Sequence, residues 1–331
     1  MFCRNVFMLL IIFNFMKRGQ SEQFNWVFVL VAGAIILGFF VMFVFKYQDL
    51  QQKKLSVNVG KILDENIKLL ETTELYLDDK EFDLGLRVKI DFYCQDQENF
   101  FEINDYFEQK LKNIVLFSDA NYVTDSFDAW ITSWNPGFFV ANFVYLINPN
   151  KVIYLYYTQN DIELLNTLDF PEEILNFKKV NNINIDVEDK KDVVILFLTP
   201  VQSVNSLKSD NVKLRGIDSQ RKEIIFYEDQ QKRSKYIGNE MIYGAVFSEN
   251  YDMFECAKAN VFNRLKKVAK LYSLKASFLN RVITKVECDY NQISSELNRL
   301  SQYEGEDIEE IMASIIEQNN ELGGRGCAVV F

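Results

Sequence analysis

The chain has 331 residues, of which 48% are hydrophobic and 15% aromatic, so it is long and apolar enough to form one large domain or two small ones. Its net charge of −11 opposes contact with phosphate backbones, and nucleic acid is therefore excluded as an expected partner. Histidine is absent, which excludes Ser-His-Asp and Cys-His catalysis and every imidazole metal ligand.

The first predicted element is a transmembrane helix over residues 24–46. The run from Phe24 to Phe45 contains no charged residue, and at about 1.5 Å per residue it matches the thickness of a hydrocarbon core. Trp26 and Tyr47 lie near its two ends, where aromatic side chains anchor helices at the bilayer interface. The pattern predicts one helix that contacts the lipid bilayer through residues 24–46.

The residues before this run, Lys17, Arg18, Gly19 and Gln20, resemble the archaeal class III, or prepilin-like, signal peptide. In that family a peptidase cuts on the cytoplasmic side, after a basic pair and a small residue, and the apolar helix stays on the mature protein. The resemblance implies a cut between Gly19 and Gln20. Bacterial pilins carry a glutamate at the fifth mature position, whereas Glu22 would be the third here. An ordinary signal anchor with a basic flank is the alternative.

Residues 1–15 admit two explanations. Their apolar core is too short to span a bilayer. Met16 can be the true start, which leaves Lys17 and Arg18 in the cytoplasm and the body of the protein outside. Alternatively, residues 1–15 form half of a membrane hairpin, which places the body inside. Basic residues stand on both sides of the helix, so the positive-inside rule does not decide the orientation. We favour the start at Met16, with residues 1–19 as leader and signal.

Beyond the membrane we expect a stalk, a sheet domain and a helical layer. Residues 47–77 repeat apolar side chains with helical spacing and predict an amphipathic stalk helix, which Gly60 would weaken. Residues 78–250 alternate between strand and helix patterns, which predicts a mixed α/β domain. Residues 251–331 change to helical spacing and predict a helical layer packed on that domain. The fold class is therefore α/β or α+β.

Strand patterns dominate residues 78–250. Residues 82–94 alternate strictly and give the clearest strand, and residues 136–149 fit either a helix or a strand. A hairpin is expected around Asp218. Residues 160–179 predict two short helices, the first capped by Asn160 or Asp161 and the second opened by Pro171. Further strands are predicted at 113–118, 126–134, 151–157, 181–187, 192–200 and 241–248.

Helices are predicted for residues 251–286, 288–300 and 307–322, and the apolar C-terminal residues are expected to dock on them.

Four cysteines follow the membrane run: Cys94, Cys256, Cys288 and Cys327. None has the CxxC spacing of zinc or redox sites, so we predict no metal site and no cofactor. In an oxidising exterior an even, scattered set indicates two disulfides, and we prefer Cys94 with Cys256 and Cys288 with Cys327. Four reduced, buried thiols are the alternative.

Acids and hydroxyls at the ends of strands are candidates for ligand binding or carboxylate hydrolysis. Asp119, Asp125 and Asp128 follow the strand at 113–118, and Asp161 and Ser203 follow two later strands. Ligands of α/β sheets bind beyond the carboxyl ends of strands, but such residues more often cap helices or form turns. No Gly-rich phosphate loop or G-x-S-x-G motif is present, so catalytic residues stay unknown.

An aromatic cluster around Asn135 is a candidate recognition surface for a partner. It contains Trp130 and Trp134, and packing in the protein core is the role that we favour for it.

The chain from Met16 onward also resembles a group of single-pass archaeal membrane proteins of uncharacterised activity. The resemblance lies in the entry "KRGQSEQFNW", the strand "VKIDFYC" and the end "NNELGGRGCAVVF". It implies a location in the cell membrane with the C-terminal domain outside, and it implies no activity. We expect a binding or scaffolding protein with protein partners in the envelope. A pilin-like or minor filament subunit and a membrane-tethered carboxylate-dependent hydrolase are the alternatives.

Overall fold

The computed structural model describes residues 3–72, 80–112, 114–171, 176–182, 192–201, 204, 207, 209, 211–283, 285, 287–303 and 308–331, without the side chains of 3–25, 71–72 and 80–81. The chain forms two compact units, Met1–Leu55 and Ser56–Phe331, and the boundary lies inside the first helix. The helices are α1 (Cys3–Thr72), η1 (Gln159–Asp161), α2 (Ile162–Thr167), α3 (Asn239–Phe247), α4 (Tyr251–Val282), α5 (Asn291–Ser301) and α6 (Ile308–Gly324). The strands are β1 (Lys80–Gln95), β2 (Glu98–Ile103), β3 (Phe107–Leu111), β4 (Val115–Phe117), β5 (Asn121–Trp134), β6 (Ala141–Ile147), β7 (Lys151–Tyr156), β8 (Asn176–Val180), β9 (Asp192–Phe197), β10 (Val212–Asp218), β11 (Glu223–Tyr227) and β12 (Gln231–Lys235).

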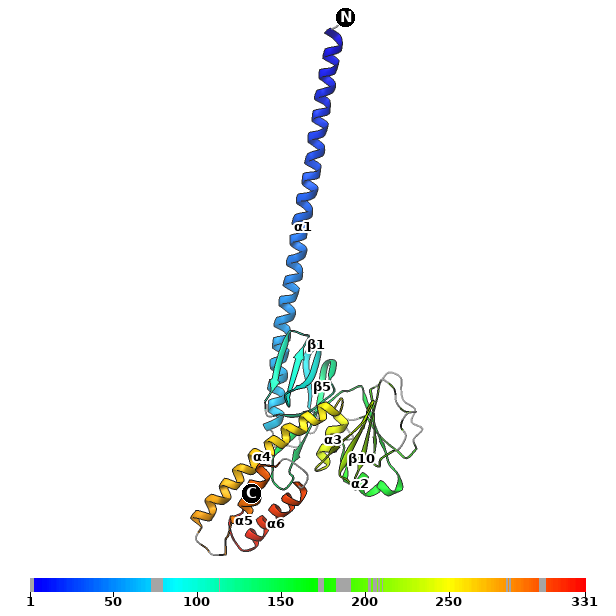
Figure 1. Ribbon diagram of the computed structural model, residues 1–331. Coiled ribbons are helices and arrows are strands. Elements are labelled where there is room, and N and C mark those ends of the chain that lie inside the picture. The colour runs from blue at the N-terminus through cyan, green and yellow to red at the C-terminus, as the bar shows by residue number, and fades with distance from the viewer. Residues whose placement is uncertain are drawn as a thin grey trace. The chain divides into compact units, whose positions relative to one another are not determined.

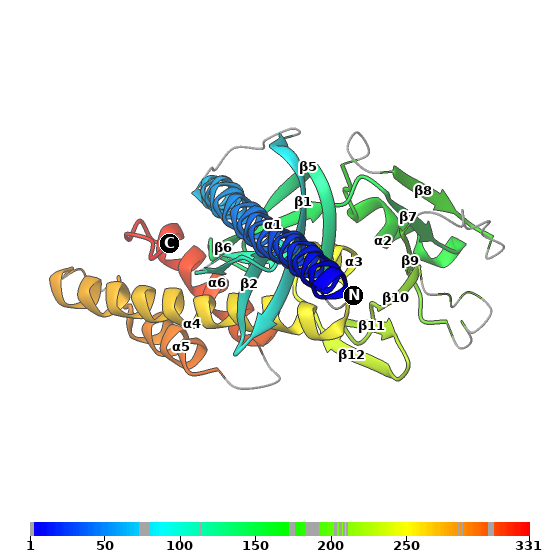
Figure 2. The same cartoon turned by 90° about the horizontal axis from the view of Figure 1, so that it is seen from above.

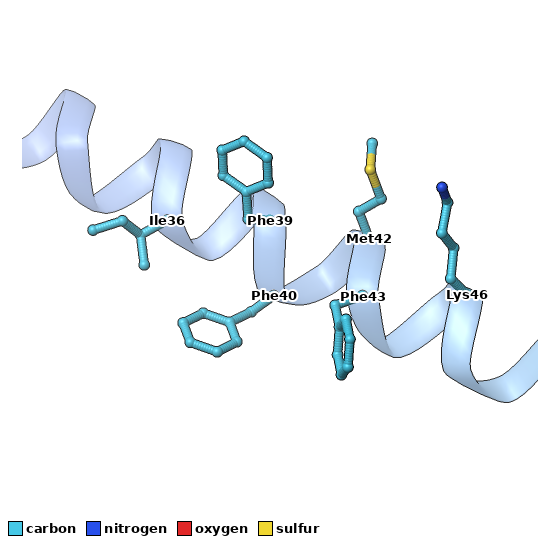
Figure 3. Close-up of a pocket in the computed structure, with 6 residues that line it drawn as sticks. All are labelled: Ile36, Phe39, Phe40, Met42, Phe43 and Lys46. Atoms are coloured by element: carbon cyan, nitrogen blue, oxygen red, sulfur yellow. The ribbon is translucent and has the colours of Figure 1, made fainter.

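Helix α1 is one uninterrupted helix from Cys3 to Thr72 (Figure 1). The part from Trp26 onward is long and apolar enough to cross a membrane, which confirms the predicted long apolar helix. Figure 3 shows large apolar side chains projecting from this helix, with Lys46 at the end of the group. The shallow hollow between these side chains lies on the surface of a single helix, so in a bilayer acyl chains would fill it.

The last turns of α1 belong to the second unit and pack on a sheet. Val59, Leu63, Ile67 and Leu70 are buried against one face of that sheet, with the spacing of one helix stripe. The predicted stalk helix is therefore confirmed to Thr72, and residues 73–77 lie outside the described residues. Gly60 does not interrupt this helix, and its missing Cβ leaves space for the ring of Phe107 on β3.

The predicted mixed α/β domain contains two sheets, each of six strands. Sheet A has the order β3-β2-β1-β5-β6-β4, antiparallel except where β4 runs parallel to β6. Sheet B has the order β12-β11-β10-β9-β7-β8, in which β8, β7, β9 and β10 are parallel and the hairpin β11–β12 is antiparallel. Figure 2 shows β7 to β10 side by side. The turn after Asp218 joins β10 to β11, which confirms the predicted hairpin.

One central core joins the two sheets and the C-terminal helices. It takes Phe117 and Tyr145 from sheet A, Leu196 from sheet B, Phe247 from α3 and Leu265 from α4. The opposite face of sheet A packs on α1, and the opposite face of sheet B forms a smaller cluster with residues of the following loops. The helical layer predicted for residues 251–331 therefore shares its core with the sheets, as expected.

Two secondary-structure predictions are wrong. Residues 241–248, predicted as a strand, form most of α3, because the helix is buried on all sides and its sequence shows no polar face. The second short helix predicted for 160–179 gives way to strand β8 at Asn176, while residues 172–175 lie outside the described part of the chain. The ambiguous segment 136–149 contains strand β6. Of the strand predicted at 181–187, residues 183–187 are not described.

Two disulfides connect distant parts of the fold, with the connectivity preferred from the sequence. Cys94 on β1 is joined to Cys256 on α4, and Cys288 before α5 is joined to Cys327 after α6. The C-terminal residues dock as expected: Val330 is buried, and its backbone N–H donates to Asn319 Oδ1 over 2.7 Å. In the chain-entropy account, the link across 39 residues stabilises the fold by about 4 kcal/mol.

We predict that Gly60→Ala destabilises the second unit by about 1–2 kcal/mol, because a Cβ would lie 2.2 Å from Cδ1 of Phe107. The gain in helix propensity offsets only part of this cost. Urea unfolding of the protein in detergent measures the change. Gly38→Ala, whose Cβ would meet nothing within 4 Å, is the control and should leave the midpoint unchanged. Phe107→Leu in the Gly60→Ala background should recover stability, and equal stability of Gly60→Ala and the parent would refute the packing argument.

Candidate functional site

Asp119 lies in a buried ionic cluster between the two sheets. One of its carboxylate oxygens, Oδ1, accepts a hydrogen bond from Lys151 Nζ over 2.6 Å and another from Lys213 Nζ over 2.9 Å. Lys213 also donates to the carboxylate of Glu249 over 2.7 Å. Asp119 follows β4 of sheet A, whereas Lys151 and Lys213 start or lie in strands of sheet B. The cluster therefore connects the sheets by charge as well as by packing.

Arg215 positions the acidic side of this cluster. Its guanidinium is fully buried over the ring of Phe226 and donates to the carbonyl oxygens of Ala245, Ser248 and Glu249 at the end of α3. Cations are favourable at the C-terminus of a helix, where carbonyl groups lack helical partners. Burial lowers the pKa of Arg215 to about 10, which still leaves it charged near neutral pH.

The charges of the cluster set the pKa of Asp119. Burial by itself raises the pKa of this carboxyl, but the attraction of Lys151 and Lys213 outweighs it and holds the pKa below its ordinary value. Burial lowers the pKa of Lys151, although Asp119 opposes this effect. The pKa of Lys213 is raised, because its two carboxylate partners outweigh its burial. Asp119 is therefore a permanent anion near neutral pH.

This geometry fits a structural ion pair better than a ligand site. Asp119 and the side chain of Lys151 are almost inaccessible to solvent, and the Asp119 backbone N–H donates to the buried hydroxyl of Tyr122. The second oxygen of Asp119, Oδ2, is buried without a hydrogen-bond partner, which concentrates the attraction of both lysines on one atom. An anion with a low pKa and no exposed surface cannot act as a general base toward a bound substrate.

The other predicted acids do not join Asp119. Asp125 is exposed on β5, and Asp128 is half-buried further along the same strand. Asp161 accepts hydrogen bonds from the backbone N–H and the hydroxyl of Thr158, over 2.8 and 2.6 Å, and so closes a turn before α2. Ser203 lies outside the described residues. The alternative role of caps and turns therefore holds for Asp161.

The predicted aromatic surface is mostly core. Trp134 is 1% exposed, stacks on Phe143 and donates its indole N–H to the carbonyl of Ile237 over 3.0 Å, so the prediction of a recognition role for it is wrong. Trp130 is half-buried with its ring 4.8 Å from those of Tyr145 and Tyr243. Asn135 is exposed at the turn after β5. Large aromatic side chains gain more free energy inside the core than on a surface.

A polar hollow of about 270 Å³ lies beside the β1–β2 turn. It is lined by both acids and bases, among them Asp96, Glu98, Lys110, Lys112 and Lys267. Lys110 forms an ion pair with Glu98 inside it. The mixture of charges gives the hollow no preference for either an anion or a cation.

Four large apolar side chains on α4 are exposed. Leu271, Leu274, Phe278 and Val282 are 65%, 58%, 60% and 53% exposed, although the opposite face of this helix is in the central core. At roughly 100° per residue, all four fall within an arc of roughly 80°. We call these four residues the α4 stripe. Figures 1 and 2 show that the C-terminal half of α4 extends past the sheets with α5 beside it.

Sequence reasoning missed the lysines, Arg215 and the stripe. Lys213 and Arg215 are two residues apart on β10, a spacing that places both on the sheet face that meets α3. The sequence therefore indicated two basic side chains on the same face of one strand. The sequence carried only a partial signal for the stripe, because apolar residues on both faces of residues 271–282 fit either a helix buried on all sides or a helix with an exposed apolar face.

The residues of the predicted processing site, Lys17 to Gln20, lie in the helical backbone of α1, and their side chains are outside the described part. Comparisons of the sequence and the structure with known protein families, curated proteins and solved structures found no match.

We predict that Asp119→Asn destabilises the fold by about 3–5 kcal/mol, because it leaves two buried lysines without their shared anion. Asp125→Asn, an exposed change, should stay within about 0.5 kcal/mol of the parent. Urea unfolding at neutral pH measures both. A loss for Asp119→Asn no larger than that for Asp125→Asn would contradict a stabilising cluster.

The parent protein and the Asp119→Asn variant also test the pKa of Asp119. The folded pKa of Asp119 is lower than the unfolded value of about 3.9, so its contribution is complete above that pH and falls as pH drops toward the folded pKa. The stability difference between the parent and Asp119→Asn should therefore narrow below about pH 4. A difference that stays constant through this range would show that Asp119 is not the titrating group.

Proposed function

We propose that the chain is a membrane-anchored protein whose folded unit lies outside the cytoplasm and binds a partner protein. The observation that carries the binding role is the α4 stripe, because contiguous apolar side chains exposed on a folded domain mark contact surfaces. The anchor is the apolar part of α1. The site supports no catalytic role of comparable strength, since the buried acid with a perturbed pKa is held in an ion pair.

The outside location rests on two supports. Disulfides form and persist in oxidising compartments, and the two pairs of cysteines are placed for such bonds. The resemblance of Lys17 to Gln20 to a class III signal puts the basic pair in the cytoplasm and a cut before Gln20. Together they support the proposal that the second unit lies on the oxidising side of a cell membrane.

A pilin-like or minor filament subunit is the second candidate, and the course of α1 favours it. One helix supplies a membrane-crossing segment and then packs its last turns on a sheet. Pilins use a helix in this way. A filament role requires, in addition, the cut before Gln20 and self-association through the apolar segment.

We predict that the protein purified from native membranes has an intact mass that begins at Gln20. Reduction should then add about four daltons, two for each disulfide. Mass spectrometry with and without reductant gives both values. A protein that retains residues 1–15 and keeps its mass on reduction would place the second unit in the cytoplasm and overturn the proposed location.

The binding role is tested by a photo-crosslink in intact cells. Replacement of Leu274 with p-benzoylphenylalanine places the reactive group on the stripe, and replacement of Val123, which is 60% exposed on β5, is the matched control. We expect one discrete adduct from position 274 and none from position 123. The absence of any adduct at positions 271, 274 and 278 in turn would contradict a partner-binding role.

A further inference from the structure

We propose that the α4 stripe binds an acidic amphipathic helix of a different protein; this inference deepens the proposed binding function and rests on it. The helix that carries the stripe differs in charge from the rest of the chain. Between Cys256 and Val282 there are seven lysines and arginines and no aspartate or glutamate, whereas the whole chain has a net charge of −11. The apolar surface is therefore placed on a locally basic element.

The basic residues border the stripe on both sides. At roughly 100° per residue, Lys270 and Arg281 lie next to one edge, and Lys275 lies next to the other. Lys267 is exposed one turn before Leu271. An apolar seam with one sign of charge on its borders is how paired helices select a partner, because apolar residues meet along the seam and border charges meet the opposite sign.

Neighbouring elements limit the width of the surface. Lys270 Nζ donates to Asn298 Oδ1 of α5 over 2.9 Å, and Lys275 Nζ donates to the carbonyl of Val330 in the C-terminal residues over 2.6 Å. The stripe thus runs between α5 and the C-terminal residues, with a length of about 17 Å from Leu271 to Val282. Its length and narrow width match about three turns of one docked helix.

Charge argues against a second copy of the chain as the occupant, and shape argues against a bilayer. In a second copy of this chain that paired stripe to stripe, basic borders would meet basic borders, which costs free energy. A bilayer presents a broad plane, whereas the stripe is narrow and is bordered by α5 and the C-terminal residues. A helix with leucines on one face and glutamates beside them satisfies both the seam and its borders.

The test uses the full-length protein in detergent and a labelled synthetic peptide of three heptads, with leucine at positions a and d and glutamate at e and g. A second peptide carries lysine at e and g. Fluorescence anisotropy should show saturable binding of the acidic peptide, and the basic peptide should bind at least about tenfold more weakly. Equal binding of both peptides, or binding of neither, would overturn the proposal.

Variants locate the binding. Leu274→Gln with Phe278→Gln should weaken binding of the acidic peptide by about tenfold or more, because these side chains lie at the centre of the seam. Val123→Gln, an equally exposed apolar position on β5, should leave it unchanged. Lys267→Gln with Arg281→Gln should weaken binding and reduce its dependence on salt. Thermal unfolding of each variant separates lost binding from lost folding, and peptide binding that is insensitive to these changes would refute the site.

Other outcomes separate the partner class from the binding function. Suppose that sedimentation shows a dimer, that Leu274→Gln with Phe278→Gln abolishes the dimer, and that the acidic peptide does not bind. A second copy would then be the occupant, and the proposal of an acidic helix would be overturned. If the protein floats with phosphatidylglycerol vesicles and substitution of the stripe abolishes this, the occupant is lipid, and the proposal of an acidic helix is again overturned. An adduct at position 274 in cells, together with no binding of the acidic peptide, would leave the binding function standing and refute only the chemistry proposed for its partner.

Discussion

The second unit depends on the burial of one shared core between its two sheets. Phe117, on the shortest strand of sheet A, packs its ring within 5.3–6.0 Å of Phe143, Tyr145 and Phe254, and so meets both its own sheet and α4. A Cβ at Gly244 would lie 2.6 Å from the Phe117 ring, so α3 can approach only through a glycine. The same strand ends at the Asp119 cluster. Apolar packing brings the sheets together, and the buried charges then fix which parts of them meet.

The buried charges of the cluster are not a free source of stability. Removing a carboxylate and two ammonium groups from water costs free energy, which their mutual attraction offsets only in good geometry. Here Arg215 holds the carbonyl groups at the end of α3, and Glu249 follows directly, so the second carboxylate is fixed beside Lys213. An apolar core accepts many packings, whereas this cluster is satisfied in one arrangement. We therefore infer that the cluster fixes the position of one sheet against the other, and we assign it no catalytic role.

Much of the fold could be predicted from the sequence, because an element that is buried on one face repeats its apolar residues with the period of a strand or a helix. Strict alternation in residues 82–94 predicted β1, and the helical period after Tyr251 predicted α4. The failures have the same physical origin. Residues 241–248 are buried on all sides, so α3 shows no period and looks like a strand. Strands β2 and β3 were missed because their turns use Asp96, Gln97, Asn104 and Asp105 with positive φ angles, without the glycine that marks most tight hairpins.

The candidate sites were harder to predict because they depend on which side chains the fold buries and which it leaves exposed. Sequence position marked Asp119 as a ligand candidate, but its environment is set by Lys151 and Lys213, which are distant in the chain and close only in the fold. Trp134 was a surface candidate for the same reason and is buried. The α4 stripe is the opposite case. Its residues have the pattern of core residues in the sequence, and only the packing of α4 shows that they are exposed.

The two disulfides give the stripe a rigid support. Cys256 ties the first turns of α4 to sheet A, and the link between Cys288 and Cys327 ties the turn after α4 to the C-terminal residues that border the stripe. Lys275 and Tyr290 then hold those residues through the carbonyl groups of Val330 and Ala328. A surface that is already ordered loses less conformational entropy when a partner binds. Under the proposed location and binding role, the oxidising exterior that favours these disulfides also orders the proposed contact surface.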